Sequence, residues 1–226
     1  MSTQINYRET FFQHPTLTKI SGNPTYTNLA KLKRECKANA KSVRSNLGGG
    51  AQVHLGLVST ATAYNRIAPG TPFVRPDMPP APNTEGTAAV IAANRLAYNE
   101  KLIIFNDCNL IERTIFQQIN TALDTHFLAD LIDDTTGLLV GTIPEIMSEL
   151  YDTYGTVTPQ SLTAAKTRLE STAYDHARPV ASLFTAINDY ANMAEASRAT
   201  ETPVQLINIG LIVLTRASIF FSDVRK

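Results

Sequence analysis

The residues with the clearest potential for chemistry lie in segment 45–58, which reads SNLGGGAQVHLGLV. Three consecutive glycines, Gly48, Gly49 and Gly50, precede His54 and a short apolar run. A phosphate-binding loop of this kind also requires a Lys and a Ser or Thr, placed between a strand and a helix. Neither residue stands at the required position, and the segment follows a helical pattern. We therefore interpret the glycines as a turn, in which Gly48 has a positive φ and ends the preceding helix.

The other residues that could bind metal or act in catalysis are isolated from one another. Metal sites need clustered ligands, such as Cys-x2-Cys or two His three or four positions apart. No such spacing occurs among the histidines and cysteines, which are His14, His54, His126, His176, Cys36 and Cys108. The segment DDTTG (133–137) carries one Thr too many for an aspartic protease motif, and Glu145 and Glu149 share a helical face without an evident pocket. We expect no catalytic site, metal or cofactor, with an enzyme assembled from distant residues as the alternative.

Charge is distributed unevenly along the chain. The net charge is zero, but residues 1–50 hold eight Lys or Arg against two Glu. This part therefore carries +6 and the remainder −6. Such asymmetry favours contact with a polyanion or between oppositely charged parts of two copies.

Most of these cations belong to one predicted helix over residues 27–46, with Thr27 as its N-cap. Its apolar positions recur every three or four residues, at Leu29, Leu32, Cys36, Ala40, Val43 and Leu47. The other side of the helix is basic and comprises Lys31, Lys33, Arg34, Lys37, Lys41 and Arg44. These side chains are candidate contacts for RNA phosphates or for an acidic neighbour. No aromatic residues alternate with them for base stacking, so binding would be salt-sensitive.

The middle of the chain combines a proline-rich segment with a long helical pattern. Six of the twelve prolines lie between Pro69 and Pro82, so residues 68–86 are expected to be an extended, polyproline-like connector. Before it, a short helix is predicted over 59–67 with Ser59 as N-cap. Residues 87–123 contain no Pro or Gly and predict one long helix, or two with a break near Asn106.

Capping residues predict the remaining helices. Thr142 and Glu145 have the spacing of a capping box, and Thr158 and Thr202 each precede a proline at the first helical position. Another helix is expected to open at Pro179. The predicted helices span 143–154, 159–172, 179–197 and 203–224. Because strand signals are almost absent, the predicted fold class is all-α.

The predicted helices divide into two domains at segment 154–159, which reads YGTVTP. We expect an N-terminal domain over 1–157 and a C-terminal domain over 158–226 that continues beyond Lys226. The N-terminus lacks a signal-peptide pattern, and the longest apolar tract, 206–221, is too short to span a bilayer. We expect a cytoplasmic location and no membrane contact.

Several segments in order match a known pattern. Near the start, the pattern is an apolar residue, then Gly, Asn, Tyr and an aromatic residue that open a helix. The corresponding residues here are Ile20, Gly22, Asn23, Tyr26 and Leu29. In the middle, the pattern Ala-x3-Trp-x2-Leu-x3-Tyr is matched in spacing by Ile143, Met147, Leu150 and Tyr154. A Leu-rich helix, a helix opened by Pro179-Val180 and a final TPVQLINIGLIVL follow. In this order the chain, over 17–226, resembles the Gag capsid region of copia-type (Pseudoviridae) LTR retrotransposons. The segment containing Gly48, Gly49 and Gly50 is similar to one branch of these polyproteins.

The resemblance implies a function without an active site. It implies two helical capsid domains, many copies of which assemble into a virus-like shell around the element's RNA. The contacts would be homo-oligomeric, including a dimer contact in the C-terminal domain. Two features depart from the family pattern: Leu29 and Met147 occupy its usual aromatic positions, and its Cys/His zinc knuckle is absent. A nucleic-acid-binding module that uses helix 27–46 is the alternative function.

Overall fold

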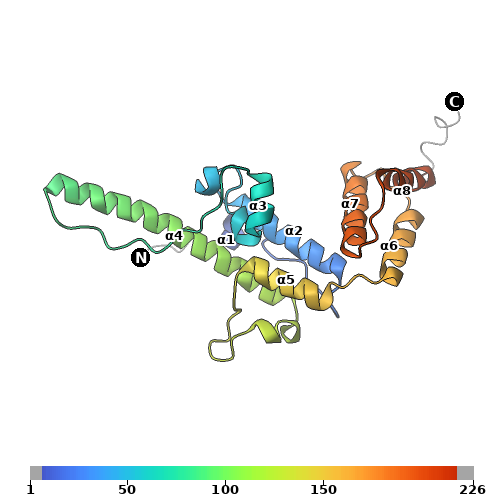
Figure 1. The fold of residues 1–226 in the computed structure, drawn as a ribbon, viewed down its shortest axis with the longest axis horizontal. Coiled ribbons are helices and arrows are strands. Elements are labelled where there is room, and N and C mark those ends of the chain that lie inside the picture. Colours follow the sequence, from blue (N-terminus) through green and yellow to red (C-terminus); the bar gives the residue numbers. More distant parts are fainter. Residues whose placement is uncertain (1–6, 218–226) are drawn as a thin grey trace. The chain divides into compact units, whose positions relative to one another are not determined.

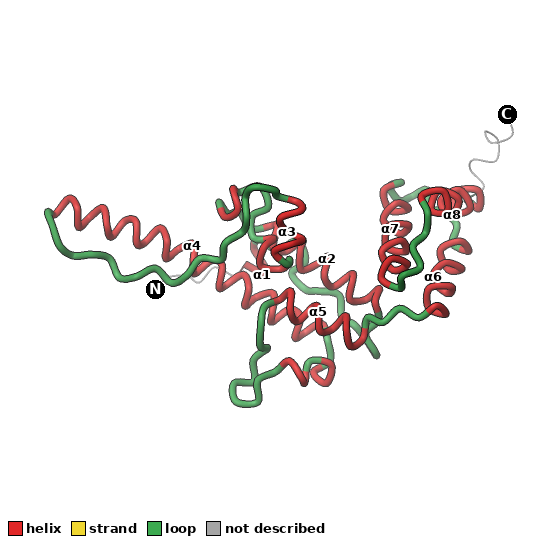
Figure 2. Tube along the Cα trace, in the orientation of Figure 1, coloured by secondary structure: helices red, strands yellow, loops and turns green. Residues whose placement is uncertain are grey.

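A computed structural model describes residues 7–217 as helices joined by loops and short turns (Figures 1 and 2). Within these residues the only β feature is an isolated bridge between Ile132 and Leu139, so the all-α fold class is confirmed. The α-helices are α1 (Tyr7–Thr10), α2 (Tyr26–Ser42), α3 (Ala61–Ile67), α4 (Ala88–Ala122), α5 (Ile143–Tyr154), α6 (Pro159–Ser171), α7 (Ala181–Ala196) and α8 (Pro203–Arg216). Single 3-10 turns span Leu47–Gly49, Leu55–Val58, Thr125–Phe127 and Ala129–Leu131.

The chain forms two compact units. The first comprises Met1–Pro24 and Asn28–Asp152, and the second comprises Thr25–Thr27 and Thr153–Lys226. The division therefore falls within the last turn of α5, whereas the sequence placed the boundary at 157/158.

The core of the first unit is built from α2, α5 and the C-terminal half of α4. The predicted apolar stripe of α2 faces this core, with Leu29 and Ala40 fully buried. The other large, fully buried apolar side chains of these helices are Leu32, Ile111, Ile115, Ile119, Ile143, Ile146, Met147 and Leu150. Burial of such side chains stabilises the fold by about 1.5–3 kcal/mol each.

Helix α4 is continuous over 35 residues, so of the two alternatives one long helix is confirmed. Its N-terminal half is accompanied by the proline-rich segment, which runs beside it and turns back at its start (Figure 1). Asn94 of α4 donates to the Asn83 carbonyl at 3.2 Å. Arg75 contacts α4 twice, with Asn109 Oδ1 at 2.9 Å and Glu112 Oε2 at 2.6 Å.

These contacts place the proline-rich segment 68–86, here called the strap, antiparallel to α4. Arg75 and Asn83 are eight residues apart, which corresponds to about 25 Å at the rise of a polyproline helix. Their partners on α4 are Asn94 for Asn83, and Asn109 and Glu112 for Arg75. These partners lie about 23–27 Å apart along the helix, so the two lengths agree. Within the strap, Pro79 is buried and the prolines three positions away, Pro76 and Pro82, are half-buried. Because polyproline has three residues per turn, these prolines share one face.

The second unit is a small bundle of α6, α7 and α8. One cluster joins Leu162 of α6, Tyr190, Met193 and Ala194 of α7, and Ile209 of α8. A second cluster consists of Leu183, Ile187 and Val213. At Gly210 an added Cβ would lie 3.2 Å from Ile187 Cδ1, so the small residue permits close approach of α7 and α8.

Several helix starts agree with the predicted capping. Thr158 and Thr202 accept hydrogen bonds from the amides of Ser161 and Gln205, and Thr202 forms a complete capping box. Thr142 and Glu145 also exchange the expected hydrogen bonds.

Other predicted boundaries were wrong. Helix α2 ends at Ser42 instead of 46, α3 is capped by Thr60 instead of Ser59, and α7 begins at Ala181 instead of Pro179. The predicted end of the last helix near 224 lies outside the described residues.

Candidate functional site

The basic side chains predicted as a contact surface lie along and just beyond α2. Four of them are exposed: Lys31, Arg34, Lys41 and Arg44. Arg44 lies beyond the end of the helix, in the loop that leads to the glycine turn. The exposed cations therefore extend from α2 into this loop.

The remaining two cations are less available than the sequence suggested. Lys33 and Lys37 are half-buried. The ammonium group of Lys33 lies over the Tyr151 ring of α5, 5.3 Å from its centroid. Burial, and secondarily the charge of Lys37, lowers the pKa of Lys33. The candidate nucleic-acid surface consequently contains fewer exposed cations than the six that were predicted.

The glycine-rich segment forms a turn. All three glycines have positive φ, with 56° at Gly48, 74° at Gly49 and 79° at Gly50. The positive φ expected at Gly48 is confirmed, but Gly48 does not end α2, which stops six residues earlier at Ser42. The segment 47–49 instead forms a separate 3-10 turn closed by Gly50.

His54 supports this turn. It is 2% exposed, and its Nδ1 lies 3.1 Å from the Val43 carbonyl oxygen. Burial lowers the pKa of His54 and favours the neutral ring. The imidazole thus links the loop after α2 to the 3-10 turn Leu55–Val58, which begins directly after His54.

A surface pocket of about 350 Å³ lies beside His54. Its walls also include Ser45, Asp107 and Arg44, a set that could be mistaken for a nucleophile with its base. However, the Ser45 hydroxyl accepts from the Leu47 amide, and His54 Nδ1 is occupied by a backbone carbonyl. These partners hold the two side chains in the turn.

Neither cysteine has the environment of a reactive thiol. Cys36 and Cys108 are free and buried. Burial raises the pKa of Cys36 to about 12 and that of Cys108 to about 11. Over residues 7–217, no group of three or more His, Cys, Asp or Glu is placed to hold a metal ion.

The segment that approximates a protease motif is a polar turn. Asp133 accepts from the amides of Thr135 and Thr136, at 3.0 and 2.7 Å, and these bonds lower its pKa. Glu145, which the sequence offered as a candidate carboxylate, accepts a hydrogen bond from the Thr142 amide and so caps the start of α5.

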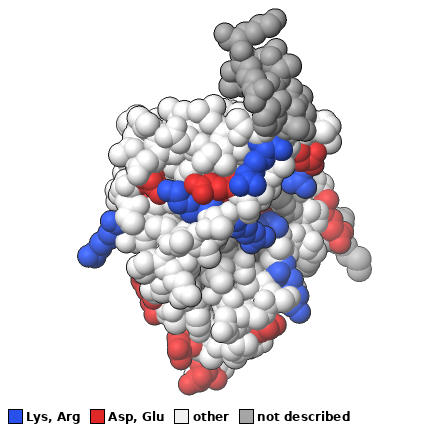
Figure 3. Space-filling model, turned by 90° about the vertical axis from the view of Figure 1, so that its right-hand side faces the viewer, with Lys and Arg blue, Asp and Glu red and all other residues white. Residues whose placement is uncertain are grey.

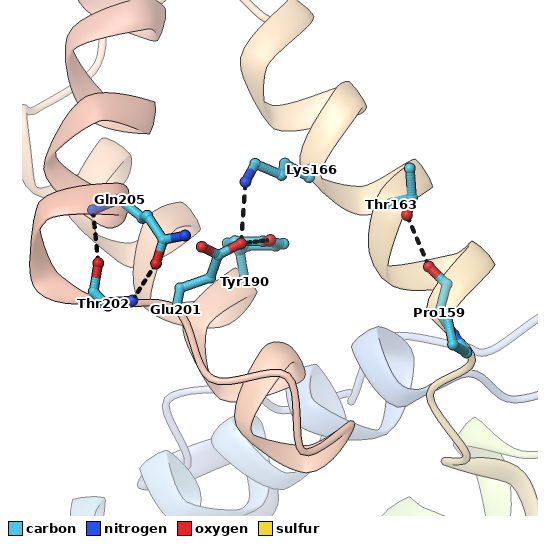
Figure 4. Close-up of polar contacts among 7 residues, drawn as sticks. All are labelled: Pro159, Thr163, Lys166, Tyr190, Glu201, Thr202 and Gln205. Atoms are coloured by element: carbon cyan, nitrogen blue, oxygen red, sulfur yellow. Dashed lines mark hydrogen bonds and ion pairs between the residues drawn. The ribbon is translucent and has the colours of Figure 1, made fainter.

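A polar cluster that sequence reasoning missed lies in the second unit (Figure 4). Glu201 Oε1 accepts from the Tyr190 hydroxyl at 2.5 Å and from Lys166 Nζ at 3.1 Å. The hydrogen bond from Tyr190 and then the ion pair with Lys166 lower the pKa of Glu201. The cluster joins α6, α7 and the loop before α8. Tyr190 and Lys166 lie 11 and 35 positions from Glu201 in sequence, so no local pattern indicates the cluster.

We expect the second unit to lose stability at acidic pH through Glu201. Because the folded-state pKa of Glu201 is depressed, its contribution is complete above the usual value of 4.5 and disappears as pH falls through the folded value. Protonation should cost at most about 1.5–3 kcal/mol, the range for hydrogen bonds to a charged group. Urea unfolding at pH 6 and pH 3 measures this loss. In Glu201→Gln the stability at pH 6 should fall and this pH-dependent loss should disappear; an unchanged loss would assign it to other carboxylates.

Each unit also exposes large apolar side chains. On α8, Val204, Ile207 and Leu211 are 65%, 61% and 53% exposed and follow one helical face. On the face drawn in Figure 3, acidic and basic side chains are interspersed between broad uncharged areas. Exposed apolar side chains that follow one helical face, as on α8, are typical of interaction sites.

The residues that carry the family resemblance have mostly structural positions. Gly22 has a φ of 77°, and Leu29, Met147 and Leu150 are buried. Asn23 and Pro179 are exposed, and Tyr154 is half-buried. Tyr26 donates to the Asn192 carbonyl at 3.1 Å within the second unit.

Comparison of the chain with protein-family models, with curated proteins and with solved structures finds no match. None of the helices in the described part of the chain is both long and apolar enough to cross a membrane.

Proposed function

We propose that this chain is a structural, self-assembling protein of capsid type, many copies of which form a shell around RNA in the cytoplasm. One observation carries the proposal: each unit exposes its own apolar side chains, on α4 in the first and on α8 in the second. A closed shell requires at least two different self-contacts per copy, because a single two-fold contact ends at a dimer. The order of family motifs supports the same function, and the proposal includes no catalysis.

The exposed cations give this proposal its RNA component. Lys31, Arg34, Lys41 and Arg44 are exposed and could each meet a phosphate. A nucleic-acid-binding module without assembly is the second candidate function, and it relies on these same four side chains. Particle formation separates the two functions.

Purified chain at high concentration and varied salt is expected to form rings or shells in electron micrographs. The variant Val204→Glu/Leu211→Glu places charges within the apolar face of α8 and should abolish them. The matched control Thr163→Glu/Thr167→Glu adds the same charges at exposed polar sites on α6 and should assemble. A wild-type chain that stays monomeric under all conditions would contradict the proposal.

The same particles allow the RNA component to be measured. Particles should protect RNA from nuclease, and reversing the charge of the four exposed cations should reduce the protected RNA. For single-stranded RNA, removing one phosphate-binding cation should lower the salt slope of binding by about 0.7. No RNA affinity even at about 50 mM salt, where phosphate contacts are strong, would remove RNA from the proposal.

A further inference from the structure

The N-terminal half of α4 has two different sides. One side bears Ile91, Asn94, Tyr98, Leu102 and Phe105, which are half-buried. Asn94 donates to the strap from this side. The other side is exposed and comprises Ala89, Ala92, Leu96, Asn99 and Ile103, here called the α4 stripe.

The α4 stripe has the spacing of a helix-pairing surface. Its members follow one another at intervals of three, four, three and four residues, which is the heptad pattern. Leu96 and Ile103 are 62% and 59% exposed, so the strap leaves them uncovered. A helical face of this kind is normally stabilised by packing against another element.

Charges beside the stripe indicate which element packs against it. Arg95 and Glu100 are exposed and flank the stripe on opposite sides, five positions apart. In a parallel, in-register pair of helices, residues at this spacing face each other across the seam. Arg95 of one copy would then face Glu100 of the other, twice by symmetry. Neither side chain makes an ion pair within residues 7–217.

We propose that the α4 stripe is a homodimer surface that packs against the same stripe of a second copy, with the two helices parallel and in register. This inference deepens the proposed function by assigning one of its self-contacts, and in that sense it rests on it. The stripe contains two alanines and spans about two heptads, so the contact is weak. Many weak contacts are what an assembly of repeated copies requires.

Disulfide trapping tests the geometry directly. In a parallel, in-register pair, Asn99 meets its own counterpart at the seam, so Asn99→Cys should form a covalent dimer under mild oxidation. Ala97→Cys is the matched control, because it is also exposed on α4 but lies off the stripe. The native Cys36 and Cys108 are buried and should remain unreactive. Equal cross-linking of both variants would overturn the proposal.

Charge exchange tests the pairing across the seam. Arg95→Glu and Glu100→Arg should each weaken dimerisation, measured by sedimentation equilibrium, by roughly 2- to 30-fold. The double variant Arg95→Glu/Glu100→Arg should restore it. A mixture of the two single variants should form heterodimers in preference to either homodimer. Because both sites are exposed, far-UV circular dichroism should be unchanged, and failure of the double variant to recover would overturn the pairing.

The two proposals can fail separately. If the wild-type chain forms particles but Asn99→Cys does not cross-link, the α4 contact is wrong and the capsid function stands. If Asn99→Cys cross-links and the charge exchange is restored while no particle forms under any condition, the α4 contact stands and the capsid function fails.

Discussion

Replacing Gly48 with alanine is expected to destabilise the first unit by about 2–5 kcal/mol. Two costs combine. At a φ of 56° an L-residue is strained by about 1–2 kcal/mol. The new Cβ would also overlap the Tyr64 hydroxyl oxygen and lie 3.1 Å from Tyr64 Cζ. Tyr64 is 1% exposed, so relief requires repacking of about 1–3 kcal/mol. Urea unfolding followed by far-UV circular dichroism measures the sum.

Two control variants separate these costs. Gly70 has a similar φ of 83°, but nothing lies within 4 Å of its added Cβ, so Gly70→Ala should show the backbone strain alone. The Tyr64 hydroxyl is buried without a hydrogen-bond partner among the described residues, so Tyr64→Phe should be nearly neutral. Combining Gly48→Ala with Tyr64→Phe should recover about 1–2 kcal/mol of the packing term. If Gly48→Ala costs no more than Gly70→Ala, the overlap has no energetic consequence.

Gly48 also illustrates how far the sequence predicted this part of the fold. The triple glycine correctly indicated positive φ, because few other residues adopt that conformation. The end of α2 was wrong because it depends on contacts outside the helical pattern. Ser42 donates back to the Asn39 carbonyl at 2.7 Å, and the Val43 carbonyl lies against His54, eleven positions ahead. Both interactions compete with continuation of the helix.

The proline-rich segment shows the same division between local and long-range information. The prolines predicted that this segment forms neither helix nor central strand, and residues 71–85 form neither. The position of the strap along α4 depends on the pairs Asn83–Asn94 and Arg75–Glu112, which are 11 and 37 positions apart. Long-range polar contacts of this kind leave no periodic signal. The α4 stripe depends on the same contacts, because the strap lies on the other side of the helix and leaves Leu96 and Ile103 exposed.

The exposure of the predicted cations follows from helical periodicity only in part. Four of the six are exposed, and Lys31, Arg34 and Lys41 lie opposite the apolar stripe of α2. Lys33 follows Leu29 by four positions and therefore borders that stripe, and its contact with Tyr151 of α5 joins residues far apart in sequence. The cluster around Glu201 escaped prediction for the same reason.

The N-terminal segment before α2 depends on a buried polar network, and its loss is the second large effect that we expect. Asn39 of α2 is fully buried and Gln118 of α4 is 2% exposed. The Asn39 side chain accepts from the His14 amide at 2.8 Å and donates to the His14 carbonyl and to Gln118 Oε1, both at 2.9 Å. Gln118 donates to the carbonyls of His14 and Pro15, both at 2.9 Å. Two helices therefore bind one short stretch of backbone through side-chain amides.

Asn39→Ala should destabilise the first unit by about 2–5 kcal/mol. It removes three hydrogen bonds and leaves the buried Gln118 Oε1 and the part-buried His14 amide without these partners. A buried group left unsatisfied costs about 1–3 kcal/mol, and the part-buried amide costs less. Gln118→Ala should cost somewhat less, because the His14 carbonyl keeps its bond from Asn39. Since the two side chains share that carbonyl and contact each other, the double variant should cost less than the sum of the single variants.

Hydrogen exchange assigns this loss to the correct unit. In Asn39→Ala, amides of α2 and of the C-terminal half of α4 should exchange faster, because the segment that crosses them is released. Amides of α6, α7 and α8 should be unaffected and serve as the internal control. Asn94→Ala, which removes one exposed hydrogen bond to the strap, is the matched Asn substitution and should cost less than about 1 kcal/mol. If both Asn variants have the same small effect, the buried network does not hold the N-terminal segment, and apolar burial of Phe12, Leu17 and Ile20 must hold it instead.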